Sequence, residues 1–593
     1  MPQTSRKTQT APRWTLSDLL AHPQKDFDKL CVSLEKQVSQ LEKLRPRLTQ
    51  GVSTSLFHQA YQLKNSITEI SAIIHAFAFL WFAENTQQQS ARAFKGKIRE
   101  QLTSFENRIL FLDLWWQDLT PQKAKPLLHQ SETLQYYLET LTRLKPHTLS
   151  EAEEQIISVK DSTGRNAMEM LYGVLTSGLK FSLTIDGVIH SLSREELTTH
   201  ARHSSARRRQ AAYQELFRVY ENNQNVIGEM YKTLVLDWKN EGITLRHHQT
   251  PIAVRNRAND VPDQAVTALL KTCRKNASLF QHYFRLKAKL LRRKTFTRYD
   301  LYAPIQARTS TYSFQEAWKI VEESYQQFSP HFAQLAKQVI TERHLDAQIR
   351  PGKMGGAFCY SVTPHRTPYV LMSFNGQPRD VSTLAHELGH AIHGMLAKKH
   401  SVLTFHSSLP LAETASIFGE QLLSENFLSQ ERKAQSKRAL LVNQLDDLYA
   451  TILRQAYFVE FERVAHHMIG EGATIDALAK SYLQLLREQF GRAVQVPKEF
   501  QWEWLSIPHI FGSPFYCYAY SFGNLLVLAL YQRYTREGPS FIPKYLNLLS
   551  AGGSASPESL LKPLKVNIRS ENFWQEGFRR IEDLIRALEK TMP

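Results

Sequence analysis

The spacing of apolar residues predicts helices along most of the chain. From Thr15 to about Ser193, apolar residues recur at steps of three and four in long segments with few glycines, the period of an amphipathic helix. The segment "LEKQVSQLEKLRPRL" has coiled-coil character, but Pro46 breaks it within a few turns and favours packing in a helical bundle. Helical periodicity returns from about Glu195, so the sequence predicts a mainly α protein.

Alternating or β-rich residues predict strands in two places. The stretch "KFSLTI", residues 180–185, lies among glycines and predicts a short strand or hairpin. Residues Ala357–Val362 and Tyr369–Phe374 are both β-rich, and the turn dipeptide Asn375-Gly376 follows them. We expect these two runs to form one small antiparallel β-sheet that leads directly into a helix.

A change in texture divides the chain. Glycines become frequent over residues 164–187, and at 593 residues the chain is long enough for two or three lobes with large buried cores. We expect a disordered polar tail over residues 1–14, an N-terminal helical lobe over 15–194 and a catalytic domain over 195–593.

Composition narrows the class of protein. Hydrophobic residues make up 42% and charged residues 22%, the profile of a soluble globular chain. The apolar window Ile70–Ala83 is shorter than the roughly 20 residues that span a bilayer and contains His75, so we expect a buried helix and no membrane partner. The start carries no apolar run of signal-peptide length. Four dispersed cysteines without a CxxC pair indicate reduced thiols and a cytoplasmic location.

The chain is basic, with a net charge of +17 from 73 basic and 56 acidic residues. Such a surface can attract nucleic acid, anionic membranes or acidic peptides. The two densest clusters, "HARHSSARRRQ" and "RLKAKLLRRKTFTR", have the apolar spacing of helix surfaces. We therefore interpret them as solvated helix faces and expect no nucleic-acid partner.

The stretch "STLAHELGHAIHGMLAKK" carries the candidate chemistry. Asp380, Ser382 or Thr383 can cap a helix, and His386 and His390 then lie one turn apart on one face, where two imidazoles can hold one metal ion. Glu387 lies between them in sequence and can reach a water at that metal without binding it, which is the HExxH arrangement. His393 falls on a neighbouring strip, and packing explains it better than metal binding.

Zinc hydrolases use three protein ligands and keep one position open for water. The segment "LPLAETASIFGEQLLSENF" offers Glu413 and Glu420, seven residues apart on roughly the same face of a helix. We expect Glu413 to be the third ligand and Glu420 to orient an imidazole, although an exposed helix glutamate explains Glu420 nearly as well. A third histidine at the HExxHxxGxxH position is excluded, because Leu396 stands there.

These motifs together resemble the thimet oligopeptidase superfamily of zinc metallopeptidases, specifically its oligoendopeptidase F branch. The likeness runs from about Asp161 to Phe573 and rests on blocks in the right order: "SSARRRQAAYQELFRVY", "YDLYAP", "PGKMGGAFCYSV", "TLAHELGHAIHG", "LAETASIFGE" and "IPHIFGSPFYCYAYSFGNLL". The resemblance implies a two-lobed helical ellipsoid whose deep substrate channel has one zinc ion on its floor. Narrow access would exclude folded proteins and select short peptides.

The resemblance also implies residues that assist the zinc-activated water. Glu387 would act as general base, and a His-plus-tyrosine block would bind substrate and stabilise the transition state. In this chain the block corresponds to His509 with Tyr516, Tyr518 and Tyr520. The run Gly-Ser-Pro within it is one residue longer than the family pattern. If the following segment is helical, Tyr516 and Tyr520 share a face, so we favour His509 and Tyr520 first and Tyr516 next.

The sequence leaves two alternatives to a zinc endopeptidase of short peptides. A carboxypeptidase or dipeptidyl carboxypeptidase on the same scaffold would need a pocket for a free carboxylate, for which Arg350, Arg366 and Arg379 are candidates. A basic binding protein with a structural zinc site would normally use four protein ligands. The sequence does not indicate an oligomeric state.

Overall fold

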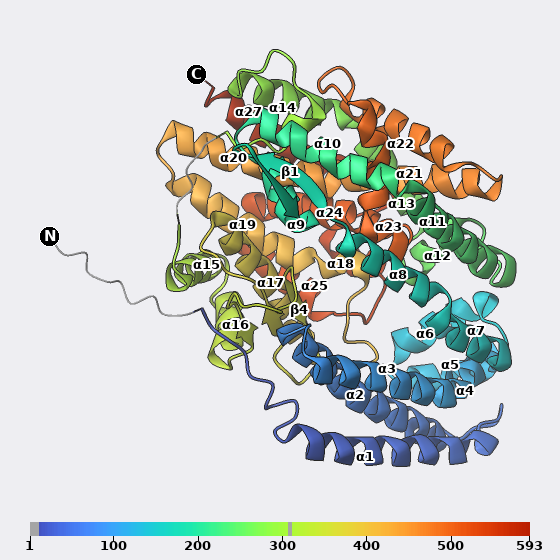
Figure 1. Cartoon of the computed structure of the whole chain (residues 1–593). Helices are drawn as coiled ribbons and strands as arrows, with labels where there is room; N and C mark the ends of the chain where they lie inside the picture. Colours follow the sequence, from blue (N-terminus) through green and yellow to red (C-terminus); the bar gives the residue numbers. More distant parts are fainter. Residues whose placement is uncertain (1–10, 306–310, 593) are drawn as a thin grey trace. The chain divides into compact units, whose positions relative to one another are not determined.

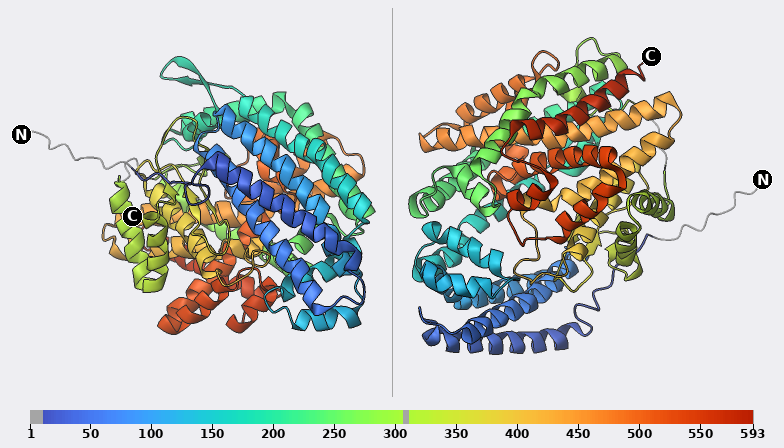
Figure 2. Two further views of the ribbon diagram at one scale, coloured as in Figure 1. Left: turned by 90° about the horizontal axis from the view of Figure 1, so that it is seen from below. Right: turned by 180° about the vertical axis from the view of Figure 1, so that it is seen from behind.

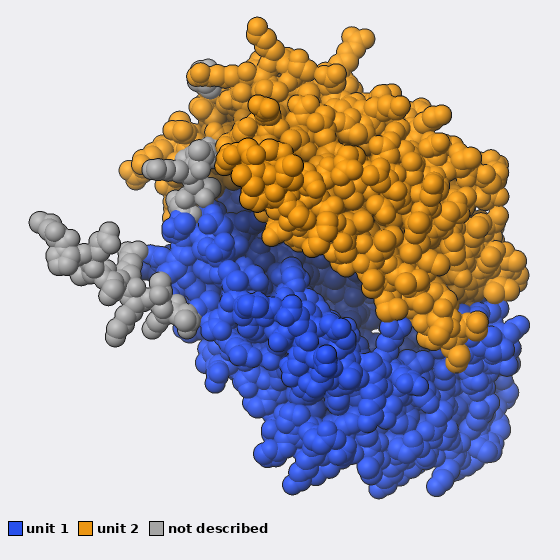
Figure 3. Space-filling view, in the orientation of Figure 1, with its two compact units in different colours: residues 1–158, 309–426, 533–564 blue, residues 159–308, 427–532, 565–593 orange. Residues whose placement is uncertain are grey.

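The computed structural model describes residues 11–305 and 311–592, and helices dominate it, as expected (Figure 1). The chain folds into two compact units, each assembled from three segments (Figure 3). Unit 1 contains residues 1–158, 309–426 and 533–564, and unit 2 contains residues 159–308, 427–532 and 565–593. The sequence division expected at residue 194 stays a prediction.

The elements of unit 1 are mostly helices. They are α1 (Pro23–Leu44), α2 (Thr54–Glu84), α3 (Gln89–Ile109), α4 (Phe111–Asp118), α5 (Pro121–His129), α6 (Gln135–Leu144), α15 (Phe314–Phe328), α16 (Pro330–Thr341), β3 (Leu345–Asp346), β4 (Phe358–Tyr360), β5 (Tyr369–Leu371), α17 (Pro378–Leu396), α18 (Leu409–Ala412), α25 (Ile542–Ser550) and α26 (Pro557–Leu561). Three helices continue from one unit into the other: α7 (Glu151–Thr163), α19 (Thr414–Gln430) and α24 (Tyr518–Glu537).

Unit 2 has the same character. Its elements are α8 (Arg165–Gly178), β1 (Phe181–Ile185), β2 (Val188–Leu192), α9 (Arg194–Ala201), α10 (Ala206–Asn222), α11 (Gln224–Lys239), α12 (Pro251–Ala258), α13 (Asp263–Lys275), α14 (Ala277–Leu290), α20 (Ala434–Leu448), α21 (Arg454–Gly470), α22 (Ile475–Phe490), α23 (Pro508–Gly512) and α27 (Glu571–Glu589).

The first three helices of unit 1 pack side by side (Figure 2). Their apolar faces bury residues such as Leu34, Phe57 and Ile98 in one core. Helix α2 is long and apolar enough to cross a membrane by length and composition alone, but Ile74, Phe77 and other apolar residues of its second half are buried in this core. The helix predicted at residues 70–83 is therefore present, and one face of it is buried while His75 is exposed.

The end of the predicted polar tail is attached to unit 1. Residues 1–10 lie outside the described residues, whereas residues 11–14 contact the folded part of this unit. The backbone carbonyl of Pro12 accepts a hydrogen bond from Ala347, and Trp14 is only 3% exposed. The Trp14 indole N–H donates to Glu84 over 2.7 Å. Burial of this large side chain outweighs the polar character of the residues before it.

The predicted sheet in unit 1 has one strand more than expected. Strands β4 and β5 pair antiparallel, as predicted, but β3 pairs parallel to β5, so the sheet is mixed and its order is β3-β5-β4. The two predicted strands are also shorter, with three residues each. Strand β3 has two residues, too few to give a period in the sequence. Helix α17 packs against β4 and β5, so the sheet lies beside the HExxH helix, as expected.

In unit 2 the stretch around residue 181 forms a hairpin. Strands β1 and β2 pair antiparallel, and the turn residues Asp186 and Gly187 both have positive φ, as a two-residue hairpin turn requires. The predicted hairpin is therefore present. With the sheet of unit 1, the described residues contain two small sheets, whereas the clearest sheet signal in the sequence was for one.

The two basic clusters of unit 2 are only partly solvated. Arg209, from the first cluster, is buried and donates to Asp300. Lys287, from the second, is fully buried and bonded to Asp446. The prediction of solvated helix faces is wrong for these two side chains, which are buried with their charges compensated by Asp300 and Asp446.

Candidate metal centre

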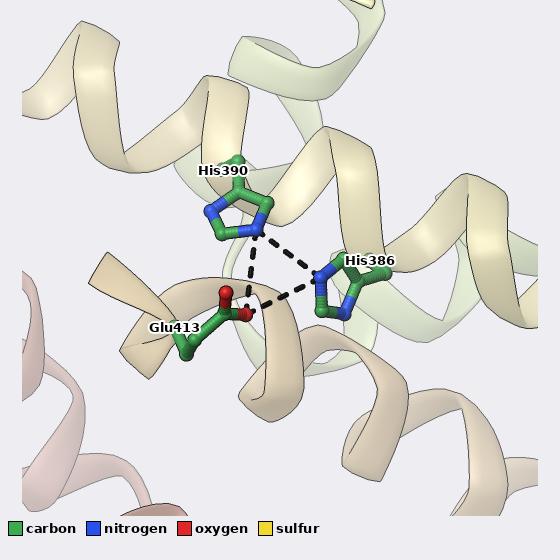
Figure 4. A group of neighbouring side chains, drawn as sticks. All are labelled: His386, His390 and Glu413. Carbon is green, nitrogen blue, oxygen red and sulfur yellow. Dashed lines mark hydrogen bonds and ion pairs between the residues drawn. The ribbon is translucent and has the colours of Figure 1, made fainter. Parts of the chain in front are cut away.

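Helix α17 sets the position of two histidines. It begins at Pro378, ahead of the expected caps Asp380, Ser382 and Thr383, because Gln377 caps it in a capping box with Asp380. His386 and His390 lie one turn apart, and their Nε2 atoms are 3.1 Å from each other (Figure 4). Both imidazoles are about one quarter exposed, since their side-chain exposures are 24% and 23%.

Glu413 meets these histidines from the junction between α18 and α19. Its Oε2 atom lies 3.3 Å from Nε2 of His386 and 3.4 Å from Nε2 of His390 (Figure 4). The hydroxyl of Ser416, in the first turn of α19, donates to the same oxygen over 2.9 Å. Burial alone would raise the pKa of Glu413, but hydrogen bonds from the two histidines hold that pKa well below its usual range.

The three ligand atoms fit a zinc ion. Zn–N and Zn–O bonds of about 2.0–2.1 Å at tetrahedral angles place neighbouring ligand atoms about 3.3–3.4 Å apart. The observed separations of 3.1, 3.3 and 3.4 Å match one face of such a tetrahedron. Two imidazoles and one carboxylate are also a donor set that zinc hydrolases use, and three protein ligands leave the fourth position open.

A glycine brings the two ligand-bearing segments together. A Cβ atom on Gly389 would lie 2.5 Å from Cα of Ser416 and 2.6 Å from the carbonyl oxygen of Ala415. The backbone of α17 therefore touches the first turn of α19, next to Glu413. Sequence reasoning did not identify Gly389, although a glycine in a helix interior is a signal for close packing.

Glu420 orients His386. Its carboxylate accepts a hydrogen bond from Nδ1 of His386, and it follows Glu413 by seven residues, about two helical turns. A proton held on Nδ1 leaves the lone pair of Nε2 free to face a metal. Glu420 therefore makes the predicted contact with an imidazole of the metal-binding pair, and it is not a helix glutamate without a contact to the site.

The other two polar residues of the HExxH helix have different environments. Glu387 is only 6% exposed and stands outside the group of metal-binding atoms, and burial raises the pKa of its carboxyl. His393 is buried and hydrogen-bonded to the backbone of Ala412, and burial lowers its pKa to about 4. His393 is therefore a packing residue, as predicted, and it ties α17 to the residue before Glu413.

The predicted His-plus-tyrosine block forms a cluster within unit 2. The hydroxyl of Tyr520 lies 3.3 Å from Nε2 of His509, and the rings of Tyr516 and Tyr520 contact each other edge to face with centroids 5.2 Å apart. Tyr518 points elsewhere: its hydroxyl accepts a hydrogen bond from Asn259 over 2.7 Å. The structure thus groups His509 with Tyr516 and Tyr520 and separates Tyr518 from them.

A buried carboxylate holds the loop that precedes this cluster. Glu462 on α21 is fully buried, and its Oε1 accepts from the backbone N–H of Phe515 over 2.7 Å. Phe515 has a φ of 59°, a left-handed conformation that is costly for an aromatic residue, and Arg255 donates to the carbonyl of Pro514 over 3.0 Å. Nothing in the sequence around Glu462 distinguished it from other helix glutamates.

Burial is the main influence on His509. Together with the charges of Arg454 and Arg194, it lowers the pKa of the imidazole. His509 is therefore neutral at pH 7, with one ring nitrogen available to donate and the other to accept.

Comparisons with known proteins agree with this geometry. The model of "Peptidase family M3" matches residues 199–580, and that of "Oligopeptidase F" matches residues 116–181.

Relatives and solved structures are similar over most of the chain. An oligoendopeptidase F homolog from Borreliella burgdorferi is 27% identical over 71% of each chain, and oligopeptidase PepF from Bacillus subtilis is 24% identical over 98% of this chain and 87% of its own. Among solved structures, a putative peptidase from Chlamydophila abortus has a TM-score of 0.83 at 23% identity, covering 98% of this chain and 100% of its own. Oligoendopeptidase-F from Enterococcus faecium has a TM-score of 0.74 at 21% identity, covering 96% and 99%.

The family match covers well over half of the chain and includes both the histidine pair and Glu413. The matched segment thus contains the metal-binding group. Membership of this peptidase family accounts for the HExxH helix, for the segment that carries Glu413 and for the fold. The chain is a metallopeptidase and belongs to peptidase family M3.

Proposed function

We propose that the protein is a zinc-dependent endopeptidase that hydrolyses internal bonds of short peptides. The observation that carries the proposal is the triangle of His386, His390 and Glu413 ligand atoms next to the buried carboxylate of Glu387. Several relatives are named oligoendopeptidases or oligopeptidases, which supports peptides rather than folded proteins as substrates.

The three ligands would hold one zinc ion per chain. The ion would supply a Lewis acid that lowers the pKa of water toward neutrality and polarises the scissile carbonyl. Glu420 fixes the tautomer and the ring orientation of His386, and Ser416 keeps one Glu413 oxygen directed at the histidines. The chain therefore prepares the donor set before any substrate arrives.

Glu387 would move the protons. Its carboxylate adjoins the ligands along α17 without joining their cluster, so it can accept a proton from the attacking water. The same carboxyl would then donate that proton to the nitrogen of the departing amine. One residue thus serves as general base and then as general acid, and the carboxyl returns to its starting state.

His509 and Tyr520 would stabilise the negative charge that develops on the carbonyl oxygen, and Tyr516 would support them. Their mutual hydrogen bond and ring contact fix the imidazole and the phenol relative to each other, and the proton that this bond does not use is available to the oxyanion. Donors of this kind contribute several kcal/mol when they are oriented before the reaction. The resemblance of this block to the His-plus-tyrosine block of oligoendopeptidase F supports the proposed role.

The sheet offers a way to hold a peptide without reading its side chains. Strand β4 is an edge strand next to α17, so an extended peptide can add to it through backbone hydrogen bonds. The free state of all four cysteines supports action in the cytoplasm, and no nucleic acid or membrane partner is proposed.

Two of the arginines considered for a free carboxylate are committed elsewhere. Arg350 makes two hydrogen bonds of 2.7 Å to the buried Asp346, and Arg366 donates to the backbone of Asp18. These contacts favour internal cleavage over a carboxypeptidase or dipeptidyl carboxypeptidase. A structural zinc site is disfavoured because the group contains three ligands rather than four.

Peptide digestion tests the proposal. Purified protein should contain about one zinc per chain, lose activity on chelation and regain it on addition of zinc. Mass spectrometry of matched peptides with free and amidated C-termini should find the same internal cleavage sites in both. Loss of cleavage on amidation would establish a carboxypeptidase, and full activity without metal would refute the zinc mechanism.

A further inference from the structure

An aromatic group lies against the edge strand of unit 1, on the side of α2. The imidazole of His75 on α2 is hydrogen-bonded through Nδ1 to the hydroxyl of Tyr360 on β4 over 2.8 Å, and the two rings stack. Phe79, one turn further along α2, stacks on Tyr360 with ring centroids 5.4 Å apart and also contacts Phe358. His75 is exposed, and the other rings are partly exposed. The group is therefore accessible.

Lys95 from α3 completes this group as a cation without an acidic partner. Its Nζ lies 4.3 Å from the ring centroid of Phe82 and 5.6 Å from that of Phe79. Among the residues that the structure describes, none forms an ion pair with Lys95, and the charge acting on it is that of Arg99. The ammonium group is thus half-buried between aromatic rings, with donor capacity that no carboxylate uses.

The pairing inside the sheet determines which backbone groups of β4 face its free edge. The N–H of Val370 donates to His344 on the β3 side, so the backbone groups of Val370 point away from β4. Cys359 is paired opposite Val370 and therefore takes no backbone hydrogen bond from β5. The N–H and C=O of Cys359 face outward, where a bound peptide can pair with them.

This register sorts the side chains of a bound peptide. Cβ atoms alternate between the two faces of a sheet, and residues directly opposite each other in an antiparallel pair share a face. Phe358 and Tyr360 direct their side chains at α2, as their contacts with Phe79 show. Peptide residues on either side of the one opposite Cys359 would share that face and lie beside the Lys95 group.

We propose that Lys95, with His75 and Tyr360, forms an anion subsite that binds a carboxylate of the peptide substrate. The proposal deepens the endopeptidase function and rests on it. The ammonium supplies the charge, and the Tyr360 hydroxyl and the imidazole supply hydrogen-bond capacity next to the edge strand. Every second residue of the bound peptide faces the subsite. The subsite therefore selects peptides that carry Asp or Glu at one of these alternate positions, counted from the scissile bond.

A glutamate scan of one peptide tests the subsite. Each position of the peptide is replaced in turn by Glu and by Gln, and every peptide is made with a free and with an amidated C-terminus. Mass spectrometry gives kcat/KM for the Glu and the Gln peptide of each pair. Because a hydrogen bond between charged groups is worth about 1.5–3 kcal/mol, the wild type should prefer Glu by roughly tenfold or more at positions of a single parity. A Glu-to-Gln ratio near one, together with a preference for free over amidated C-termini, would assign the bound carboxylate to the peptide end and overturn the selection of acidic side chains.

Three variants connect this preference to the subsite. Lys95→Met should reduce the Glu-to-Gln ratio to about one, whereas Lys95→Arg should retain most of it. Lys97→Met removes the same charge two residues along α3, where Lys97 lies over Phe27 instead, and should keep the wild-type ratio. An unchanged ratio in Lys95→Met, or no preference in the wild type, would overturn the proposal.

Binding measurements separate this result from the fate of the proposed function. Fluorescence anisotropy of the labelled Glu and Gln peptides is measured on Glu387→Gln protein with and without Lys95→Met. A Glu preference that depends on Lys95 upholds the subsite even if the wild type cleaves no peptide. Equal binding of the two peptides, together with active wild-type enzyme, rejects the subsite and leaves the endopeptidase intact.

Discussion

At the scale of single residues, the contact between Glu420 and His386 determines which imidazole nitrogen faces the metal. We expect Glu420→Gln to lower zinc affinity by about 10–100-fold, because an amide stabilises the required tautomer less than a carboxylate does. Competition with a chromophoric chelator measures the affinity. Glu425→Gln on the same helix, where Glu425 accepts from Gln421, is the control and should bind zinc as the wild type does. Equal affinities for both variants would contradict the orienting role.

A buried histidine outside the metal centre should make the stability depend on pH. His466 on α21 is buried, and burial lowers its pKa to about 3 from an ordinary value near 6.5. Between about pH 3 and pH 6.5 the unfolded state therefore binds one proton more than the folded state, so stability falls by about 1.4 kcal/mol per unit as the pH falls through this range.

Denaturant unfolding at pH 7.5 and pH 5.0 tests this dependence. Between these values His466→Leu should lose about 2 kcal/mol less stability than the wild type. His467→Leu replaces the neighbouring histidine, whose side chain is 73% exposed, and should follow the wild type. If the wild type and His466→Leu lose stability in parallel, His466 does not account for the acid sensitivity.

The metal-binding residues were predictable because their chemistry restricts their spacing. His386 and His390 must lie one turn apart, and "HELGH" states this in five letters. Glu413 could be predicted because few acidic residues follow the histidines at a suitable distance. Glu462 and Lys95 could not be predicted, since their contacts are with segments that only the tertiary structure brings to them.

At the scale of elements, the contact between α17 and α19 sets the separation of the ligands. Gly389→Ala would place a methyl group 2.5 Å from the backbone of Ser416, so one helix must shift. We expect a loss of about 1–3 kcal/mol in stability and weaker zinc binding, because Glu413 moves with α19.

Thermal unfolding and zinc titration check this expectation. The control is Gly173→Ala, in the exposed middle of α8, where nothing lies within 4 Å of the new Cβ. This variant should bind zinc normally and gain a little helix stability. Wild-type zinc affinity in Gly389→Ala would show that the close approach does not position Glu413.

The helices were easier to predict than the sheet. Their periods extend over many turns, whereas β3 has two residues and is identified only by its hydrogen bonds to β5. The cap of α17 was misplaced because Gln377 is a weak capping signal, and the sequence offered better-known caps further along. Short elements and their ends depend on tertiary contacts that no local pattern records.

At the scale of the molecule, each unit is built from three separate segments, so neither one folds from a continuous stretch of sequence. A boundary read from composition identifies a change of texture but cannot show that the chain returns to its first unit twice. The metal-binding group belongs to unit 1, and the cluster of His509 and Tyr520 belongs to unit 2.

If both units contribute to one reaction, a change in unit 2 should slow catalysis without releasing metal. We expect Tyr520→Phe to lower kcat by about 10²–10³-fold, the usual cost of one lost donor to the developing oxyanion, with unchanged zinc content. Tyr518→Phe removes a hydroxyl bonded to Asn259 and should keep near-wild-type kcat. Equal kcat values for these two variants would exclude Tyr520 from the reaction.

Zinc content and peptide hydrolysis of Glu387→Gln, measured beside the wild type, test the proposed mechanism most directly. Glutamine keeps the size of the side chain, and the residue stands outside the ligand group, so the variant should retain one zinc per chain. Loss of the general base should reduce kcat/KM by about 10²–10⁴-fold. Hydrolysis at the wild-type rate by the zinc-loaded variant would show that Glu387 does not activate the water.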